Sequence, residues 1–248
     1  MSPLTGAAAA ARRIFTRREA LGLITAAGAA AAAACGDSPT APTATTSTTS
    51  TTTPTTGTGV ASTNEACAVT PSETAGPYPS LTDFFRSDIR EGKDGTTLTL
   101  TVKVVNTNSN CAAVANAQVE IWHCDVGGNY SQYGSVTNQT FLRGIQTTDA
   151  NGTVTFTTIY PGWYQGRATH IHVEATVNGR SVKVSQMAFP ESINNAVHTA
   201  GVYASRGTNP TSNMSDGIFA DSLASELVTP SGSPATGYVA AFQLGVAI

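Results

Sequence analysis

The sequence predicts a single all-β domain, an antiparallel β-sandwich, over residues 67–248. Only 12% of the 248 residues are charged, and Thr, Ser, Asn and Gly are abundant, a composition typical of β proteins outside the cytoplasm. Short segments that alternate polar and apolar side chains follow one another, with turn residues between them. No segment of this part has a clear helical period, apart from a short stretch near residues 221–227.

The expected strands share this alternation, which places one face of each strand in a core. They are residues 97–104, 118–124, 153–157, 169–177 and 181–189. Residues 149–152, Asp-Ala-Asn-Gly, form the turn before the third strand. The last two strands flank Asn178-Gly179, a strong β-hairpin signal.

Residues 1–35 are interpreted as an export signal. Arg17 and Arg18 precede an Ala-rich apolar stretch over residues 20–34, which at about 15 residues is too short to span a bilayer comfortably. The arginine pair and its neighbours resemble a twin-arginine export motif. We therefore expect an exported protein, periplasmic or at the cell surface.

Cys35 follows small residues, as in a bacterial lipoprotein cleavage site, although Ala32 stands where Leu is usual. Whether a lipid anchors the protein through Cys35 stays open. Residues 36–66 are dominated by Thr, Ser, Pro, Ala and Gly and bury too little apolar surface to offset the entropy of ordering, so we expect a flexible linker. The remaining residues 67–248 are numerous enough to form one domain with a substantial core.

The charge balance indicates a small-molecule partner and no nucleic acid. The chain has 13 Lys and Arg against 16 Asp and Glu, a net charge of −3, and no basic cluster lies in residues 67–248. The oligomeric state is not indicated. Three cysteines in this part allow three pairings, but Cys124 lies in an expected strand, where a buried free thiol is the simpler interpretation. We therefore expect a Cys67–Cys111 disulfide, formed in an oxidising compartment.

Candidate catalytic groups gather over residues 160–172, Tyr-Pro-Gly-Trp-Tyr-Gln-Gly-Arg-Ala-Thr-His-Ile-His. His170 and His172 are two apart in a strand and therefore point to the same face, opposite an apolar face. A lone His-x-His pair is more often two ordinary surface histidines. Here Tyr164 and Arg167 precede it in one short loop containing glycine, where functional groups tend to lie.

Five motifs follow one another without large gaps. They are Gly-Pro-Tyr-Pro at 76–79, Val-Glu-Ile-Trp-His-Cys-Asp-Val-Gly-Gly-Asn-Tyr-Ser at 119–131, Phe-Leu-Arg-Gly-Ile-Gln-Thr-Thr-Asp at 141–149, Pro-Gly-Trp-Tyr-Gln-Gly-Arg-Ala-Thr-His-Ile-His at 161–172, and Ser-Gln-Met-Ala-Phe-Pro at 185–190. Together they resemble the intradiol ring-cleavage dioxygenases, such as catechol 1,2-dioxygenase and the protocatechuate 3,4-dioxygenase subunits. With only five residues between Tyr164 and His170, the chain looks more like the secreted members, with a more open site.

The resemblance implies an iron(III) ion, Fe(3+), bound by two tyrosines and two histidines, with a catechol-type compound and O2 as substrates and a muconate-type diacid as product. It makes Tyr130, Tyr164, His170 and His172 the metal ligands. It also implies that Tyr164 leaves the metal and helps to take up the substrate protons, and that Arg167 stabilises negative charge. Phenolate oxygen suits iron(III), whereas zinc and copper more often use a third His, a Cys or a carboxylate.

Gln186 matches a glutamine near the metal of the family, and its face depends on the hairpin register. A two-residue turn would pair Glu174 with Lys183 and place Gln186 opposite Ile171, on the wrong face. A three-residue loop would place it opposite His172. A shift of one residue reverses the face of every side chain, so both registers stay open.

Other aromatic and histidine side chains are given structural roles. Tyr133 is less suited than Tyr130 to be the ligand that follows Gly-Gly-Asn, His123 is expected inside a strand, and His198 is expected in a polar loop with no partner in view. Two rival functions also remain. One is a non-catalytic exported β-sandwich lipoprotein that binds a ligand or partner, and the other is a histidine-based copper or zinc protein.

Overall fold

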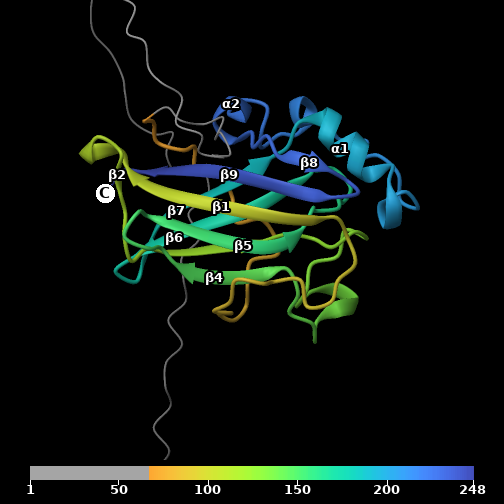
Figure 1. The fold of residues 1–248 in the computed structure, drawn as a ribbon, viewed down its shortest axis with the longest axis horizontal. Helices are drawn as coiled ribbons and strands as arrows, with labels where there is room; N and C mark the ends of the chain where they lie inside the picture. Colours follow the sequence, from red (N-terminus) through yellow and green to blue (C-terminus); the bar gives the residue numbers. More distant parts are fainter. Residues whose placement is uncertain (1–66) are drawn as a thin grey trace, which may run out of the picture. The chain divides into compact units, whose positions relative to one another are not determined.

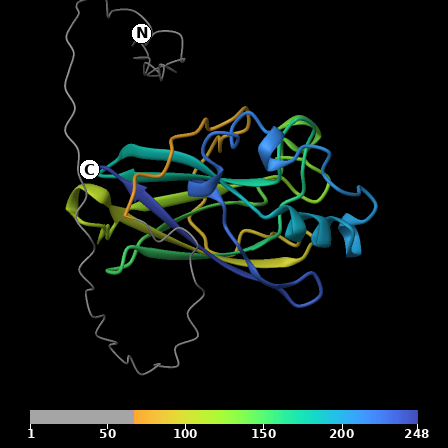
Figure 2. The same ribbon diagram turned by 90° about the horizontal axis from the view of Figure 1, so that it is seen from above.

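The computed structural model describes residues 67–248, which form two β-sheets packed face to face (Figures 1 and 2). This architecture confirms the predicted all-β sandwich. The expected export signal at 1–35 and linker at 36–66 lie outside the described residues. Within the described part, no helix has the length and apolar character needed to cross a bilayer.

One sheet contains five strands. They are β1 (Thr97–Asn106), β2 (Ala112–Ala113), β5 (Thr153–Ile159), β8 (Ser231–Ser233) and β9 (Gly237–Val246). β1 and β9 pair in parallel, and the other pairs are antiparallel. The strands expected at 97–104 and 153–157 are therefore present, and each is longer than predicted.

The second sheet has four antiparallel strands in the order β4-β3-β6-β7. They are β3 (Gln118–Trp122), β4 (Arg143–Thr147), β6 (His170–Val177) and β7 (Arg180–Ala188). Apolar residues of both sheets, such as Leu100 of β1 and Val173 of β6, share one buried core. Because burying a side chain of this size contributes about 1.5–3 kcal/mol, the alternation fixes which face of each strand points inward.

The helices are short, and the longest described one, residues 191–198, lies at one end of the sandwich (Figure 1). They are α1 (Glu191–His198), α2 (Leu223–Glu226) and the 3₁₀ turns Thr107–Ser109, Gly134–Val136, Gly201–Tyr203 and Asn213–Ser215. α2 lies within the expected 221–227, but the expectation of no other helix was wrong. α1 buries the polar Asn194 and His198 beside Val197, so in eight residues only Ile193 and Val197 carry the apolar period that marks a helix.

The hairpin between β6 and β7 combines the two registers considered for Gln186. The turn has two residues, because Val177 pairs with Arg180, but the register shifts between Ala175 and Thr176. The extra residue is a β-bulge. Beyond the bulge, Gln186 lies opposite His172.

The Glu174–Lys183 pair, which a two-residue turn without a bulge would give, is absent for the same reason, and Glu174 lies opposite Val184. Lys183 lies opposite Ala175, and its ammonium group donates to the carbonyl of Thr70 (2.7 Å) and to the hydroxyl of Ser72 (2.8 Å). The bulge therefore turns this lysine toward the segment that precedes β1.

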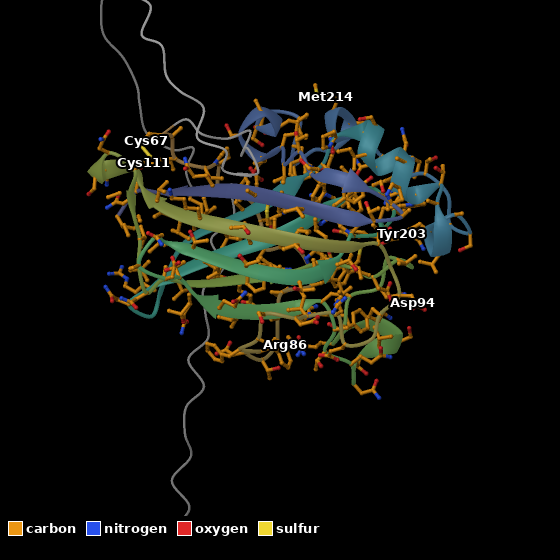
Figure 3. All side chains as sticks on the ribbon, viewed as in Figure 1. Cys67, Arg86, Asp94, Cys111, Tyr203 and Met214 are labelled. Carbon is orange, nitrogen blue, oxygen red and sulfur yellow. A yellow bond between two sulfur atoms is a disulfide. The ribbon has the colours of Figure 1, made fainter. Side chains whose placement is uncertain are left out.

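The segment before β1 is tied to the sandwich at its start by the predicted Cys67–Cys111 disulfide, with a Cα–Cα distance of 5.6 Å. Figure 3 shows this disulfide at one end of the sandwich and Tyr203 at the other. Cys124 is buried and free, as expected. From Cys67 the segment passes β7, where the Glu73 N–H donates to the Val184 carbonyl (2.9 Å), and continues to the site.

Candidate metal centre

The side chains of His170 and His172 lie on the face of β6 that points away from the core. Ile171 between them is part of the core. The strand therefore presents the two imidazoles side by side, as its alternation predicts. This face is not open to solvent, since His170 and His172 are only 2% and 1% exposed. Aromatic side chains cover it, among them Trp122 and Tyr130.

His170 is oriented by a hydrogen bond to its own loop. Its Nδ1 lies 2.6 Å from the carbonyl of Ala168, and since a carbonyl only accepts, Nδ1 carries the proton and Nε2 keeps its lone pair. Nε2 lies 3.2 Å from Nε2 of His172 and 3.3 Å from the hydroxyl of Tyr130. Two further potential metal-binding atoms therefore lie within 3.3 Å of Nε2 of His170.

His172 is held differently. Its ring stacks on Trp122, with centroids 4.8 Å apart and planes at 1°, and its Nδ1 has no hydrogen-bond partner among the described residues. Gly76 also approaches this imidazole closely, because a Cβ at this position would lie 3.0 Å from Cε1 of His172. The stack on Trp122 and the Nε2 contact with His170, rather than a bond from Nδ1, therefore fix this ring.

Tyr130 lies in the loop that follows β3, and polar contacts fix this loop on both sides. The Asp125 carboxylate accepts from the Asn129 N–H (2.9 Å). The buried guanidinium of Arg143 donates to the carbonyl of Ser131 (2.7 Å) and to that of Tyr78 (3.0 Å). The Tyr78 ring stacks on Tyr130 with centroids 4.8 Å apart, so the phenol is fixed from both the β4 side and the segment before β1.

Tyr164, Arg167 and Gln186 adjoin these groups. The Tyr164 ring lies 5.5 Å from that of His170 and 5.7 Å from that of Tyr130. Arg167 donates to the Gln186 side-chain carbonyl (2.5 Å) and reaches the Tyr164 hydroxyl at 3.5 Å. Gln186 in turn donates to the carbonyl of Thr74 (2.8 Å). The bulge in β7 is thus what brings Gln186 to the site.

Burial determines the protonation of these groups. It lowers the pKa of His170 to about 3 and that of His172 well below its ordinary value, so both rings are neutral at pH 7 and can offer lone pairs. It raises the pKa of Tyr130 well above its ordinary value, and that of Tyr164 is also raised by burial. The phenols therefore ionise here only beside a strong positive charge, such as a metal ion.

The arrangement fits one metal ion. Donor atoms that are about 2.1 Å from one ion and at right angles to each other lie about 3 Å apart. The separations of 3.3 Å from Tyr130 to His170 and 3.2 Å from His170 to His172 match this spacing. In residues 67–248 no group of three or more His, Cys, Asp and Glu side chains is arranged to hold a metal, so the rival site built from such side chains is not found there.

The structural histidines and Tyr133 have partners of their own. His123 is buried and lies 2.7 Å from the Thr158 hydroxyl, and Tyr133 donates to the carbonyl of Pro79 (2.7 Å). The expected loop at His198 was wrong, because His198 is the last residue of α1. The partner that the sequence did not show is the Pro161 carbonyl, 3.3 Å from Nε2 of His198.

The sequence alone did not identify several residues that shape the site. Trp122, Arg143 and Gly76 lie in the quoted motifs, but nothing in their pattern indicated stacking, clamping or close approach. Asp216 lies outside every motif, yet its carboxylate is 2.9 Å from Nε of Arg167. Only the folded chain brings these two together, since 49 residues separate them.

Comparisons with known proteins agree with this geometry. A family model described as "Dioxygenase" matches residues 78–192. An intradiol ring-cleavage dioxygenase from Tetranychus urticae is 30% identical over 73% of this chain and 95% of its own, with a TM-score of 0.68. The dioxygenase domain of a dioxygenase carbohydrate-binding protein fusion from Streptomyces sp. SirexAA-E is 28% identical over 73% of this chain and 99% of its own (TM-score 0.57). Catechol 1,2-dioxygenase from Pseudomonas arvilla C-1, at 19% identity, covers 71% of this chain and 62% of its own (TM-score 0.55) and supports the fold alone. The chain therefore belongs to the intradiol ring-cleavage dioxygenase family.

Proposed function

We propose that this protein is a non-haem iron(III) dioxygenase that opens the ring of a catechol-type substrate with O2 to give a muconate-type diacid. The observation that carries the proposal is that Nε2 of His170 lies 3.3 Å from the Tyr130 hydroxyl and 3.2 Å from Nε2 of His172. Two phenolates and one hydroxide balance the charge of a ferric ion, which makes a buried site tolerable.

The ligands we assign to the ion are Tyr130, Tyr164, His170 and His172. When bound there, iron(III) would hold both oxygens of a catechol and activate the ring for reaction with O2. The two histidines need no proton change to serve, because burial already keeps them neutral. The two tyrosines differ in exposure, which suggests different roles.

Tyr164 is the ligand suited to exchange with the substrate. Tyr130 is buried, whereas Tyr164 and Arg167 are partly exposed. The two residues between them, Gln165 and Gly166, are exposed. A phenolate at this edge can leave the metal and accept a substrate proton at its oxygen. The guanidinium of Arg167, 3.5 Å from that oxygen, is placed to stabilise negative charge that develops on the opening ring.

The direct test is a visible absorption spectrum of purified residues 67–248 with iron measured in the same sample, followed by addition of catechol under air. We expect about one iron per chain, a tyrosinate-to-iron charge-transfer band, a shift of this band when catechol binds, and release of a ring-opened diacid. A protein that stays colourless after reconstitution with iron would overturn the proposal and favour the non-catalytic binding lipoprotein. Copper or zinc in place of iron would favour the histidine-based rival.

We also propose that the protein acts outside the cytoplasm. The arginine pair at Arg17 and Arg18, the apolar stretch that follows and the Thr-rich residues 36–66 support export. The Cys67–Cys111 disulfide supports it independently, since stable disulfides are typical of oxidising compartments. A lipid on Cys35 would add an anchor, which mass spectrometry of the mature N-terminus would detect.

A further inference from the structure

Arg167 is held on two sides by partners of different strength. On one side its NH2 group donates to the neutral amide of Gln186 (2.5 Å). On the other side its Nε lies 2.9 Å from the carboxylate of Asp216, whose side chain is 0% exposed, against 15% for Arg167. NH1 remains directed at the Tyr164 hydroxyl, at 3.5 Å. The ion pair joins two opposite charges and is therefore stronger than the hydrogen bond from the guanidinium to a neutral amide, so it dominates the orientation of the guanidinium.

Asp216 also fixes the backbone that carries a metal ligand. The carboxylate oxygen that meets Arg167 accepts the N–H of Ala168 (2.6 Å). The carbonyl of Ala168 then accepts from Nδ1 of His170 (2.6 Å). One buried carboxylate thus contacts the arginine side chain directly and reaches the imidazole through a single residue.

The frame around Asp216 is itself rigid. Its second carboxylate oxygen accepts the N–H of Ile218 (2.8 Å). The preceding 3₁₀ turn, Asn213–Ser215, is closed by a capping box at Ser212. Asn213 donates to the carbonyl of Phe189 at the end of β7 (2.8 Å). An anchor built in this way has little freedom to follow a displaced arginine.

We propose that Asp216 is a positioning residue for Arg167, which holds the guanidinium in the direction that leaves NH1 at Tyr164 and the substrate. This inference rests on the proposed function, because it assigns Asp216 a part in the same reaction. Without the carboxylate, the guanidinium can turn toward Gln186 or solvent. Displacement of a catalytic group by about 1 Å can cost about 100-fold in rate, so the direction of this side chain matters as much as its presence.

The test is a double-mutant cycle with Asp216→Asn, Arg167→Met and the double variant, measured in the iron-loaded protein with catechol under single-turnover conditions. We expect Asp216→Asn to lower the rate constant about 10- to 100-fold while iron content and the charge-transfer band stay unchanged. In the Arg167→Met background the same substitution should have almost no effect, because residues that act through each other are not additive.

A purely structural role gives a different result. The full loss would then persist in the Arg167→Met background, or iron would be lost together with activity, and either outcome overturns the proposal. Asn209→Ala is the matched control, because Asn209 donates only to the carbonyl of Arg167 (2.9 Å) and to Thr169 (3.4 Å). Its effect should be the same in both backgrounds.

If Asp216→Asn does not fold, Asp216→Glu tests the positioning role instead. It keeps the charge but moves the carboxylate by one methylene group, so we expect a folded, iron-containing protein with a rate at least about 10-fold lower. An unchanged rate would overturn the proposal. The proposed function fails separately, by absence of iron or of catechol cleavage in the wild-type protein.

Discussion

The two candidate histidine ligands are held in different ways, which determines what each replacement should do. His170 has a hydrogen bond from Nδ1, whereas His172 depends on the stack with Trp122. In His172→Ala both a ligand and its packing are lost. We expect iron affinity to fall by more than the roughly 10- to 100-fold that loss of an outer partner costs, measured by iron content after dialysis against a chelator.

Tyr164→Phe should separate binding from catalysis. The other three ligands remain, so we expect much of the iron to stay while the rate of catechol cleavage falls about 100-fold or more. Tyr133→Phe is the matched control, since the Tyr133 hydroxyl bonds only to the Pro79 carbonyl and its loss should leave iron and colour in place. Full activity of Tyr164→Phe and His172→Ala would refute the ligand assignment.

Gly76 tests how closely the segment before β1 must approach the site. Its φ is +71°, and an added Cβ would lie 3.0 Å from Cε1 of His172. Gly179 has nearly the same φ, +73°, but no atom within 4 Å of such a Cβ. Both alanine variants should lose about 1–2 kcal/mol of stability from backbone strain. Only Gly76→Ala should also shift the charge-transfer band, and equal spectra would show that His172 tolerates the contact.

At the residue scale, the sequence predicted the candidate metal ligands better than the residues that pack around them. Strand alternation alone places His170 and His172 on one face, and the motifs supplied Tyr130 and Tyr164 as candidates. Contacts across long sequence distances had no local signal, as with Asp216 against Arg167 and Gly76 against His172. Neither pair could be found from periodicity, because two or more strands separate the two residues along the chain and only the tertiary fold brings them together.

Among the described elements, the five predicted strands correspond to β1, β3, β5, β6 and β7, whereas β2, β4, β8 and β9 were not predicted. The exact register of the β6–β7 hairpin was not predicted either. The Asn178-Gly179 turn fixed the hairpin, and alternation fixed the inward faces of β6. The bulge in β7 left no mark in the sequence, although it decides that Gln186 opposes His172. α1 was not predicted because its buried face includes two polar residues, Asn194 and His198. Their hydrogen bonds to the carbonyls of Phe189 and Pro161 form only in the folded chain.

The contact of α2 with β7 predicts a pH-dependent stability. Glu226 is buried, and its carboxylate meets the hydroxyls of Ser222 (2.5 Å) and Ser185 (3.1 Å). Burial raises its pKa from 4.5 to about 7. The folded protein therefore holds a proton that the unfolded chain releases, so this group makes stability fall as pH rises from about 4.5 to about 7 and has no further effect above that range.

Glu226→Gln should remove this dependence. Serine hydroxyls can donate and accept, so they can satisfy the amide. We expect urea unfolding to show a gain of about 1–3 kcal/mol at pH 8 and almost none at pH 4. Glu120, whose pKa burial also raises to about 7, leaves a residual slope in both proteins. Exposed Asp221→Asn is the control, and the same gain at pH 4 and pH 8 would contradict the assignment.

For the molecule as a whole, the disulfide ties the segment before β1 to the sandwich. Cys67 and Cys111 are 44 residues apart, and closing a loop of this length stabilises a protein by about 4 kcal/mol in the chain-entropy model. The double variant Cys67→Ser/Cys111→Ser should lose about 2–4 kcal/mol of unfolding free energy. Reducing agent should then destabilise the wild type alone. An equal effect on both proteins would mean that the disulfide does not form.

The same disulfide reports on export. If the twin-arginine route carries the folded protein, Arg17→Lys/Arg18→Lys should leave the precursor in the reducing cytoplasm. Cys67 and Cys111 of this precursor should both react with maleimide after denaturation, whereas those of the exported protein should react only after reduction. Cys124 labels in both samples after denaturation, because it is free, and so calibrates the gel shift. Normal export of the double variant would exclude this route, and a disulfide in the retained precursor would remove the disulfide as support for export.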